Sequence, residues 1–464
     1  MKRRTALLLG CLLALHAQAA TIDDELRRAQ DLAWHKRFAE AEGLYRRIID
    51  RNPKSRAAAL GLGQVLLWEQ RYGDAASVYR RLLRNAPDDV DARRGLATAE
   101  YWSGDFRSAQ RDFASVLAAR PNDADARKAL AEIAATTAPV IASENAFVTD
   151  DQPLRRATIG ISASFFSDPL TKWTGTAGTY ALSARDAGFG SATAPFASIA
   201  VNATIPAPQL RASGTVRVLR FPDGTTKPLG GVGLAREWSH ASITAEIDRR
   251  EILYTASALR GHPSETTSTL GWNRNSDATS SAAAVHSIFY FDRNRGRAAE
   301  AYHLVRIAKS ARTSLSAGAS ASYRDSDESR FRLIGASAAP VAGGGFAYAY
   351  DARYVPYWTP RHLIEMRGIV TATVDAGRAT IRLHGDGGWA HDRDLIFGPA
   401  SGTTALAPLF AAPIEASRAF HPWRASAEVA VPLRGAFTIT FGAERQTTIF
   451  YRATAFHLGF SGRL

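Results

Sequence analysis

A short run of titratable side chains in the C-terminal part of the chain has the spacing for chemistry. It contains His384, Asp386, His391 and Asp392, followed by Arg393. On a β-strand His384 and Asp386 would share one face, which suits a metal site or an acid–base pair. The alternative, which we favour, is that these groups line the water-filled interior and the mouth of a barrel.

Signatures of known catalytic sites are missing from the sequence. It has no His-Glu-x-x-His, no Gly-x-Ser-x-Gly, no phosphate-binding loop and no cysteine cluster. We therefore expect no enzyme activity and no catalytic, metal or cofactor site. A barrel enzyme that acts on lipid or protein is kept as the least favoured alternative.

Ionic residues recur on the polar faces of alternating segments and are candidates for lining a lumen. They are Glu246, Asp248, Asp351, Arg353, Glu365, Arg367, Arg382, His384 and Asp386. Rings of opposite charge set the electric field in a pore and decide which polymers can pass. The alternative is that the same charges cross-link a closed barrel that conducts nothing.

Segments that could position these residues alternate apolar and polar side chains. In the segment 437–444 one face is Phe, Ile, Phe, Ala and the other is Thr, Thr, Gly, Glu. Because the polar face carries ions as well as hydroxyls, the pattern is typical of a barrel with a wet lumen and a lipid-facing exterior. We predict an antiparallel transmembrane β-barrel of about 16 strands, within a range of 12 to 18, over residues 153–464, after a linker at 136–152.

The last residues support a membrane barrel. Phe456, Leu458, Phe460 and Leu464 would share one face of a final strand, as in the closing strands of outer-membrane barrels. After the N-terminal segment, no stretch has the roughly 18 uninterrupted apolar residues of a spanning helix. A chain that crosses the membrane without such helices must do so as a closed barrel.

The first part of the chain repeats with a period of 34 residues. Apolar residues within each unit have helical spacing and a proline follows, so each unit is predicted to be a helix pair. The pattern is similar to the tetratricopeptide repeat and predicts an α-solenoid of three helix pairs over residues 21–135. The columns that repeat are Trp34, Trp68, Trp102; Phe38, Tyr72, Phe106; Ala41, Ala75, Ala109; Tyr45, Tyr79, Phe113; and Pro53, Pro87, Pro121.

Two aromatic columns of the repeats are predicted to fill the core. The residues are Trp34, Trp68 and Trp102, with Phe38, Tyr72 and Phe106. A large aromatic side chain in an inter-helix column normally fills volume. The alternative for the tryptophans is a row of sugar-stacking platforms.

Residues 1–20 are expected to be a signal peptide. Lys2, Arg3 and Arg4 precede an apolar stretch, and cleavage would follow Ala19 or Ala20. Lipidation at Cys11, the only cysteine, is a less favoured alternative.

The net charge of +13 is dispersed along the chain, which argues against nucleic acid as a partner and suits a polar pore or an anionic membrane surface.

Periplasmic tetratricopeptide repeats followed by a barrel resemble the exopolysaccharide export porins, such as the cellulose- and poly-N-acetylglucosamine-secretion subunits. The barrel also resembles the YaiO-type outer-membrane β-barrel family, through the aromatic and proline residues of the segment 350–360. The resemblance implies a barrel that passes a growing glycan, as in biofilm formation, while the repeats dock partner proteins or polymer in the periplasm.

Together these patterns predict an outer-membrane channel, and the resemblance implies that it exports a polysaccharide. Outer-membrane lipid, periplasmic proteins and the polysaccharide are the expected partners, and the repeats are expected to lie in the periplasm. The alternative function is a membrane-anchored factor for the assembly or translocation of a surface protein.

Overall fold

The computed structural model divides the chain into a helical unit, which reaches Thr137, and a β unit that makes up most of the rest. It describes residues 22–150, 154–184, 191–206, 209–238, 240–253, 258, 262–328, 336–341, 345–350, 359–396, 414–433, 436–448 and 452–464. Within these residues no helix is both long enough and apolar enough to cross a membrane.

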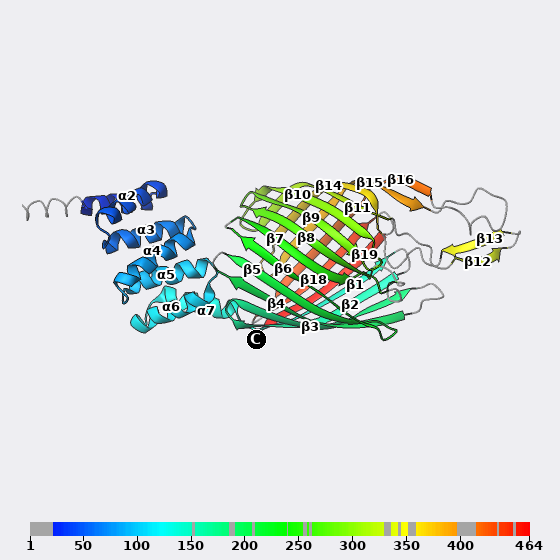
Figure 1. The fold of residues 1–464 in the computed structure, drawn as a ribbon, viewed down its shortest axis with the longest axis horizontal. Coiled ribbons are helices and arrows are strands. Elements are labelled where there is room, and N and C mark those ends of the chain that lie inside the picture. Colours follow the sequence, from blue (N-terminus) through cyan, green and yellow to red (C-terminus); the bar gives the residue numbers. More distant parts are fainter. Residues whose placement is uncertain are drawn as a thin grey trace, which may run out of the picture. The chain divides into compact units, whose positions relative to one another are not determined.

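The described part of the helical unit is a series of three helix pairs followed by one further helix, drawn in blue to cyan in Figure 1. A helix over residues 22–34 is followed by α2 (Phe38–Arg51), α3 (Arg56–Trp68), α4 (Tyr72–Asn85), α5 (Val90–Trp102), α6 (Phe106–Ala119) and α7 (Ala124–Thr136). The side chains of Ser55, Asp89 and Asp123 accept hydrogen bonds from backbone N–H groups at the starts of α3, α5 and α7, which stabilises these ends. The predicted solenoid is therefore present.

Turns within the pairs need a residue in the left-handed region. Gly104 occupies it with a φ of 82°, and Lys36 and Gln70 adopt φ values of 61° and 60° in the two preceding repeats. Only glycine takes this conformation without steric cost. The repeats therefore keep the same turn with less favourable residues.

Small residues let the helices of successive pairs pack closely. Ala41, Ala75 and Ala109 are fully buried, and the ring of Tyr79 lies against the glycines at positions 63 and 95. A side-chain carbon at either glycine would overlap this ring. The buried Tyr79 thus fixes the distance between α4 and its two neighbours.

A methyl group at position 63 should destabilise the helical unit. We expect Gly63→Ala to lower its free energy of unfolding by about 1–3 kcal/mol, the usual cost of overpacking, despite the better helix propensity of alanine. Gly73→Ala is the control, because a side chain there meets nothing within 4 Å. The measurement is urea unfolding of the full chain, followed by the helical circular dichroism signal. Equal free energies of unfolding for the two variants would contradict this packing.

One carboxyl group is buried between the helices without full compensation. Glu100 is almost fully buried, receives a hydrogen bond from Arg80 of 2.9 Å, and leaves its Oε2 atom without a partner. Burial raises the pKa of Glu100 to about 7, outweighing Arg80, and the nearby Asp112 adds to the shift. The ionised form of Glu100 is therefore destabilising.

The helical unit should lose stability between pH 4.5 and 7. The folded state holds a proton on Glu100 that the unfolded state releases at its usual pKa of 4.5, so the free energy of unfolding falls as the pH rises through this window. Glu100→Gln should remove this slope and add about 1–2 kcal/mol at pH 8. Thermal unfolding at several pH values measures this dependence of stability on pH, and Asp88→Asn at an exposed position is the control. If Glu100→Gln kept the pH dependence of the wild type, Glu100 would not be its source.

The β unit is built around an antiparallel sheet of 17 strands. Its strands are β1 (Val140–Asp150), β2 (Leu154–Asp168), β3 (Thr171–Ala184), β4 (Ser191–Ile205), β5 (Leu210–Arg220), β6 (Thr226–Glu237), β7 (Ala241–Glu251), β8 (Ser264–Asn275), β9 (Thr279–Tyr290), β10 (Arg295–Lys309), β11 (Thr313–Ser326), β14 (Arg361–Asp375), β15 (Thr380–Ile396), β16 (Ile414–Phe420), β17 (Trp423–Pro432), β18 (Phe437–Thr447) and β19 (Arg452–Arg463). A separate two-stranded sheet contains β12 (Ala336–Val341) and β13 (Gly345–Tyr350).

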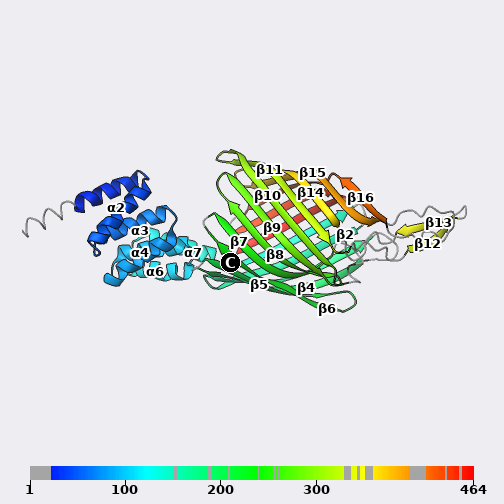
Figure 2. The same ribbon diagram turned by 45° about the horizontal axis from the view of Figure 1, so that its top comes forward.

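The large sheet closes into a barrel (Figure 2). β1 pairs with β2 on one edge and with β19 on the other, and β9 pairs with β10. β16 and β17 pair with successive stretches of β15 and so share one place in the wall. With that place counted once, the 17 strands occupy 16 positions, which confirms the predicted strand number.

The structure corrects the boundary before the barrel. Residues 136–152 were expected to be a linker, but α7 reaches Thr136 and β1 begins at Val140. All of β1 pairs with β19, from Val140 opposite Arg463 to Asp150 opposite Ala453. The barrel therefore starts at Val140 rather than at residue 153, because β1 supplies the pairing that closes the wall.

Candidate functional site

The two faces of the wall can be assigned from contacts between strands that are not neighbours. Arg156 on β2 donates a hydrogen bond of 2.9 Å to the backbone oxygen of Leu253, which follows β7. Such distant strands can meet only across the interior. Residues that lie directly opposite each other on neighbouring strands share a face of the sheet. Following these pairs from Arg156 through the intervening strands leads to Glu444 on β18 and then to His384 on β15. These residues define the interior face, and their neighbours in sequence lie on the exterior face.

The exterior face is apolar. Large hydrophobic side chains on it are exposed in the absence of lipid, among them Ile161, Ile199, Val232, Ile247, Val285, Met366, Val370, Leu383, Phe441 and Phe456. Such a continuous apolar surface on a closed barrel is typical of proteins of the outer membrane.

An ionic cluster on the interior face links β14, β15 and β17. The carboxylate of Asp386, whose side chain is 3% exposed, lies 2.7 Å from Arg367 Nη1, 2.7 Å from His384 Nε2 and 2.8 Å from Arg424 Nε. Arg367 also binds Glu365 at 3.1 Å. The structure therefore brings together four of the residues selected from the sequence and adds Arg424.

The chemistry of this cluster is that of a cross-link. Three cationic or hydrogen-bonding partners satisfy Asp386, so its charge is held in place rather than left to attack or deprotonate a substrate. Among the described residues, no group of three or more His, Cys, Asp or Glu side chains could hold a metal ion. The arrangement fixes the electric field along the interior wall.

His391 and Asp392 do not join this cluster. His391 lies on the exterior face, where its ring stacks on Trp389 with 5.9 Å between the centroids. Asp392 is fully buried and binds Arg418 at 2.8 Å.

Of the other candidate lumen residues, Arg382 pairs with Glu428 on the neighbouring β17. Asp351 and Arg353 lie outside the residues that the structure describes.

Two carboxylates on the opposite part of the wall have no ion-pair partner within the described residues. Glu246 and Asp248 on β7 face Gly233 and Gly231 of β6 across the ladder. The register places them on the interior face, because Gly231 shares its side of β6 with Leu229, which lies opposite Arg217 of β5. The missing side chains at the two glycines leave the carboxylates uncovered, so they present negative charge to the interior.

The sequence did not reveal that part of the interior is filled. Leu182, Ala194, Leu219, Phe221, Leu229, Leu253 and Ala258 form a buried apolar cluster. The wall residues of this cluster lie on the otherwise polar face of β3 to β6. The only sequence signal that could have indicated this filled region is a leucine on the polar face of a strand, for example Leu219 two residues after Arg217.

Polar contacts hold the end of β7 and described residues that follow it against the interior wall. Glu251 accepts hydrogen bonds from Tyr180 at 2.8 Å and from Arg217 at 3.0 Å. Lys227 donates a bond of 2.7 Å to the backbone oxygen of His262. Leu253 and His262 are therefore held by the interior wall, and Leu253 and Ala258 belong to the buried apolar cluster.

The tryptophans of the repeats do not belong to the core. Trp34, Trp68 and Trp102 are 80%, 46% and 60% exposed, which corrects the expectation that they fill volume between helices. Each is the last residue of the first helix of its pair, where the helix end reaches solvent. Of the second column, Phe38 and Phe106 pack against the buried clusters, and Tyr72 is half-buried.

Comparison with known protein families identifies the first of the two parts. Residues 26–90 and 66–133 match tetratricopeptide repeat families. No curated protein matches the chain. The first unit is thus an array of tetratricopeptide repeats, as expected from its 34-residue period.

Several solved structures align with part of the chain. A bacterial polysaccharide outer membrane secretin aligns with 71% of this chain and 99% of its own, at 9% identity and a TM-score of 0.49. A tetratricopeptide repeat protein from Parabacteroides merdae aligns with 28% of this chain and 53% of its own, at 21% identity and a TM-score of 0.24. MamA from Desulfovibrio magneticus aligns with 25% and 65%, at 17% identity and a TM-score of 0.24. At these identities the likeness concerns the fold alone.

Removing an exposed tryptophan should cost little stability. We expect Trp34→Ala to change the free energy of unfolding of the helical unit by less than about 1 kcal/mol, whereas Tyr45→Ala should cost about 3–5 kcal/mol, because Tyr45 is buried. Urea unfolding of the two variants in the full chain measures both values. Equal losses would restore the core assignment of the tryptophan.

Proposed function

We propose that the protein is an outer-membrane channel that exports a polysaccharide, with its tetratricopeptide repeats in the periplasm docking partner proteins or polymer. The observation that carries this proposal is the closed wall of 16 positions with an apolar exterior and an ionic interior. A polar chain crosses a membrane only through a wall that keeps water inside and satisfies every backbone group.

The ionic interior supports transport of a hydrated chain. The cluster around Asp386 and the Arg382–Glu428 pair form a fixed wall of alternating charge. Such a wall offers hydrogen bonds to hydroxyl groups without a single deep site, so a polymer can slide along it. The uncovered Glu246 and Asp248 should favour small cations over anions in the same space.

The buried apolar cluster bears on an alternative function. The cluster around Leu219 and Phe221 fills part of the interior at one end of β3 to β6 and narrows the space within the wall. A barrel narrowed in this way could instead anchor the repeats at the membrane and assist the assembly or translocation of a surface protein. Conductance separates the two functions.

A planar bilayer containing the full chain tests the channel. We expect discrete conductance steps in potassium chloride and a preference for cations, because Glu246 and Asp248 are unpaired. The double variant Glu246→Gln, Asp248→Asn should lower the permeability ratio of potassium to chloride roughly twofold. Asp277→Asn, in the short turn between β8 and β9, is the matched control and should leave the ratio unchanged.

A wild-type barrel that inserts and conducts nothing would rule out the channel and leave the anchoring function. If the double variant and the control behaved alike in a conducting barrel, the placement of Glu246 and Asp248 in the permeation path would be wrong.

A further inference from the structure

We propose that Trp34, Trp68 and Trp102 form a row of stacking platforms for the pyranose rings of a neutral polysaccharide. This inference rests on the proposed export function and names the ligand that the repeats would hold. It starts from the exposure of three large aromatic side chains at one repeat position.

Equivalent positions place the tryptophans in a regular row. Trp68 ends α3 and Trp102 ends α5, and Trp34 ends the helix over residues 22–34 in the same way. Because α3 and α5 contact each other, their axes lie about 8–10 Å apart. Two pyranose rings of an extended glycan span a similar length, so successive tryptophans can contact every second sugar.

Neighbouring aromatic rings hold these side chains in place. Trp68 packs against Phe38 of the preceding repeat with 5.9 Å between the centroids, and Trp102 meets the edge of Tyr101 at 5.3 Å. Trp68 and Trp102 are therefore each supported by one neighbouring ring and keep substantial exposed area, and Trp34 is the most exposed of the three. A platform fixed before binding loses little conformational entropy when a ligand arrives.

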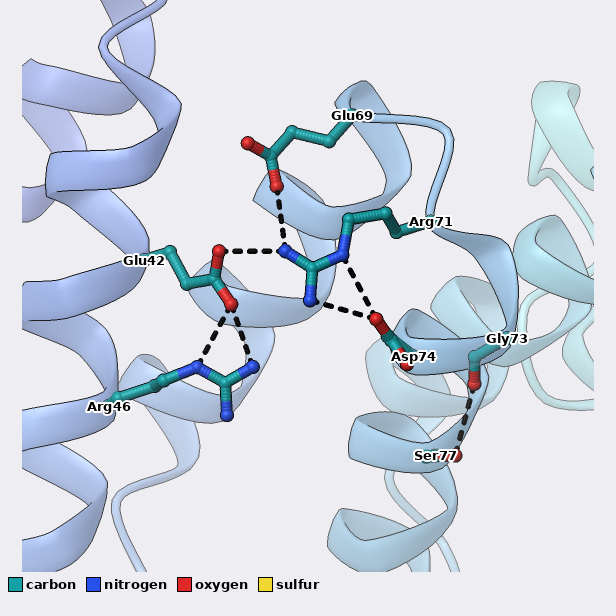
Figure 3. A network of polar contacts seen from close by, with 7 residues as sticks. All are labelled: Glu42, Arg46, Glu69, Arg71, Gly73, Asp74 and Ser77. Carbon is teal, nitrogen blue, oxygen red and sulfur yellow. Dashed lines mark hydrogen bonds and ion pairs between the residues drawn. The ribbon is translucent and has the colours of Figure 1, made fainter. Parts of the chain in front are cut away.

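Charged side chains close in sequence to Trp34 and Trp68 are engaged in ion pairs. Arg71 binds Glu42 at 2.8 Å, Glu69 at 3.2 Å and Asp74 at 2.8 Å, and Arg46 binds Glu42 at 2.7 Å, as Figure 3 shows. In the preceding turn Arg37 pairs with Glu40 at 2.7 Å. Trp34 and Trp68 therefore lie close in sequence to charges that are already paired with one another.

Such a surface fits a neutral glycan better than a charged peptide or a polyanion. The face of an indole ring is electron-rich, and the C–H groups on one side of a pyranose ring carry partial positive charge, so the two stack. The surrounding carboxylates and guanidinium groups can also bond to sugar hydroxyls without giving up their ion pairs. A charged polymer would have to break those pairs.

Isothermal titration calorimetry of the full chain in detergent tests the row. The probes are cellohexaose and the hexamer of β-1,4-linked N-acetylglucosamine. We expect binding of at least one hexamer, a loss of about fivefold or more in affinity for each Trp→Ala variant, and no binding by the triple alanine variant. Replacing all three by tyrosine should restore part of the affinity, because an aromatic face remains.

The control is Trp173→Ala, which removes a tryptophan from the exterior face of β3 and should bind as the wild type does. The inference is overturned if the wild type binds neither hexamer, if the triple alanine variant binds normally, or if the triple tyrosine variant has as low an affinity as the triple alanine variant.

Bilayer conductance of the triple alanine variant separates this test from the test of the channel. A conducting barrel without sugar binding refutes the row alone, and sugar binding with a silent barrel refutes the channel alone.

Discussion

Every wall strand must find hydrogen-bond partners on both edges, because lipid offers none to an exposed backbone. β1 meets this constraint by pairing with both β2 and β19. Without it, the first and last parts of the sheet would be open edges. Closure also fixes which side chains face inward, since a shift of one residue would exchange the two faces. The ionic interior therefore depends on the β1–β19 register.

Periodic features of this architecture could be predicted from the sequence. The 34-residue repeat and the alternating strands gave the solenoid and the number of wall positions. β1 was missed because Ser143, Glu144 and Asn145 interrupt its alternation and Pro139 and Pro153 resemble the ends of a linker. The tryptophans were misplaced because helical spacing shows which residues share a side, but not that the helix end reaches solvent.

The interior was predicted only in part, because its contacts join different strands. That His384 and Asp386 share a face follows from their spacing, and they do contact each other. The meeting of Asp386 with Arg367 and Arg424 depends on the register among β14, β15 and β17, which no single segment encodes. The buried apolar cluster beside β3 to β6 was hidden for a similar reason, since Leu253 and Ala258 join it from beyond β7.

The contacts at and just after the end of β7 have a consequence for assembly. Glu251, Leu253 and His262 accept hydrogen bonds from Tyr180, Arg217, Arg156 and Lys227, which come from β2, β3, β5 and β6, all of which precede them in the chain. These contacts can form as soon as those strands have paired, before β19 arrives to complete the wall. The N-terminal half of the sheet would then have part of its inner surface shielded while its outer edges still wait for partners.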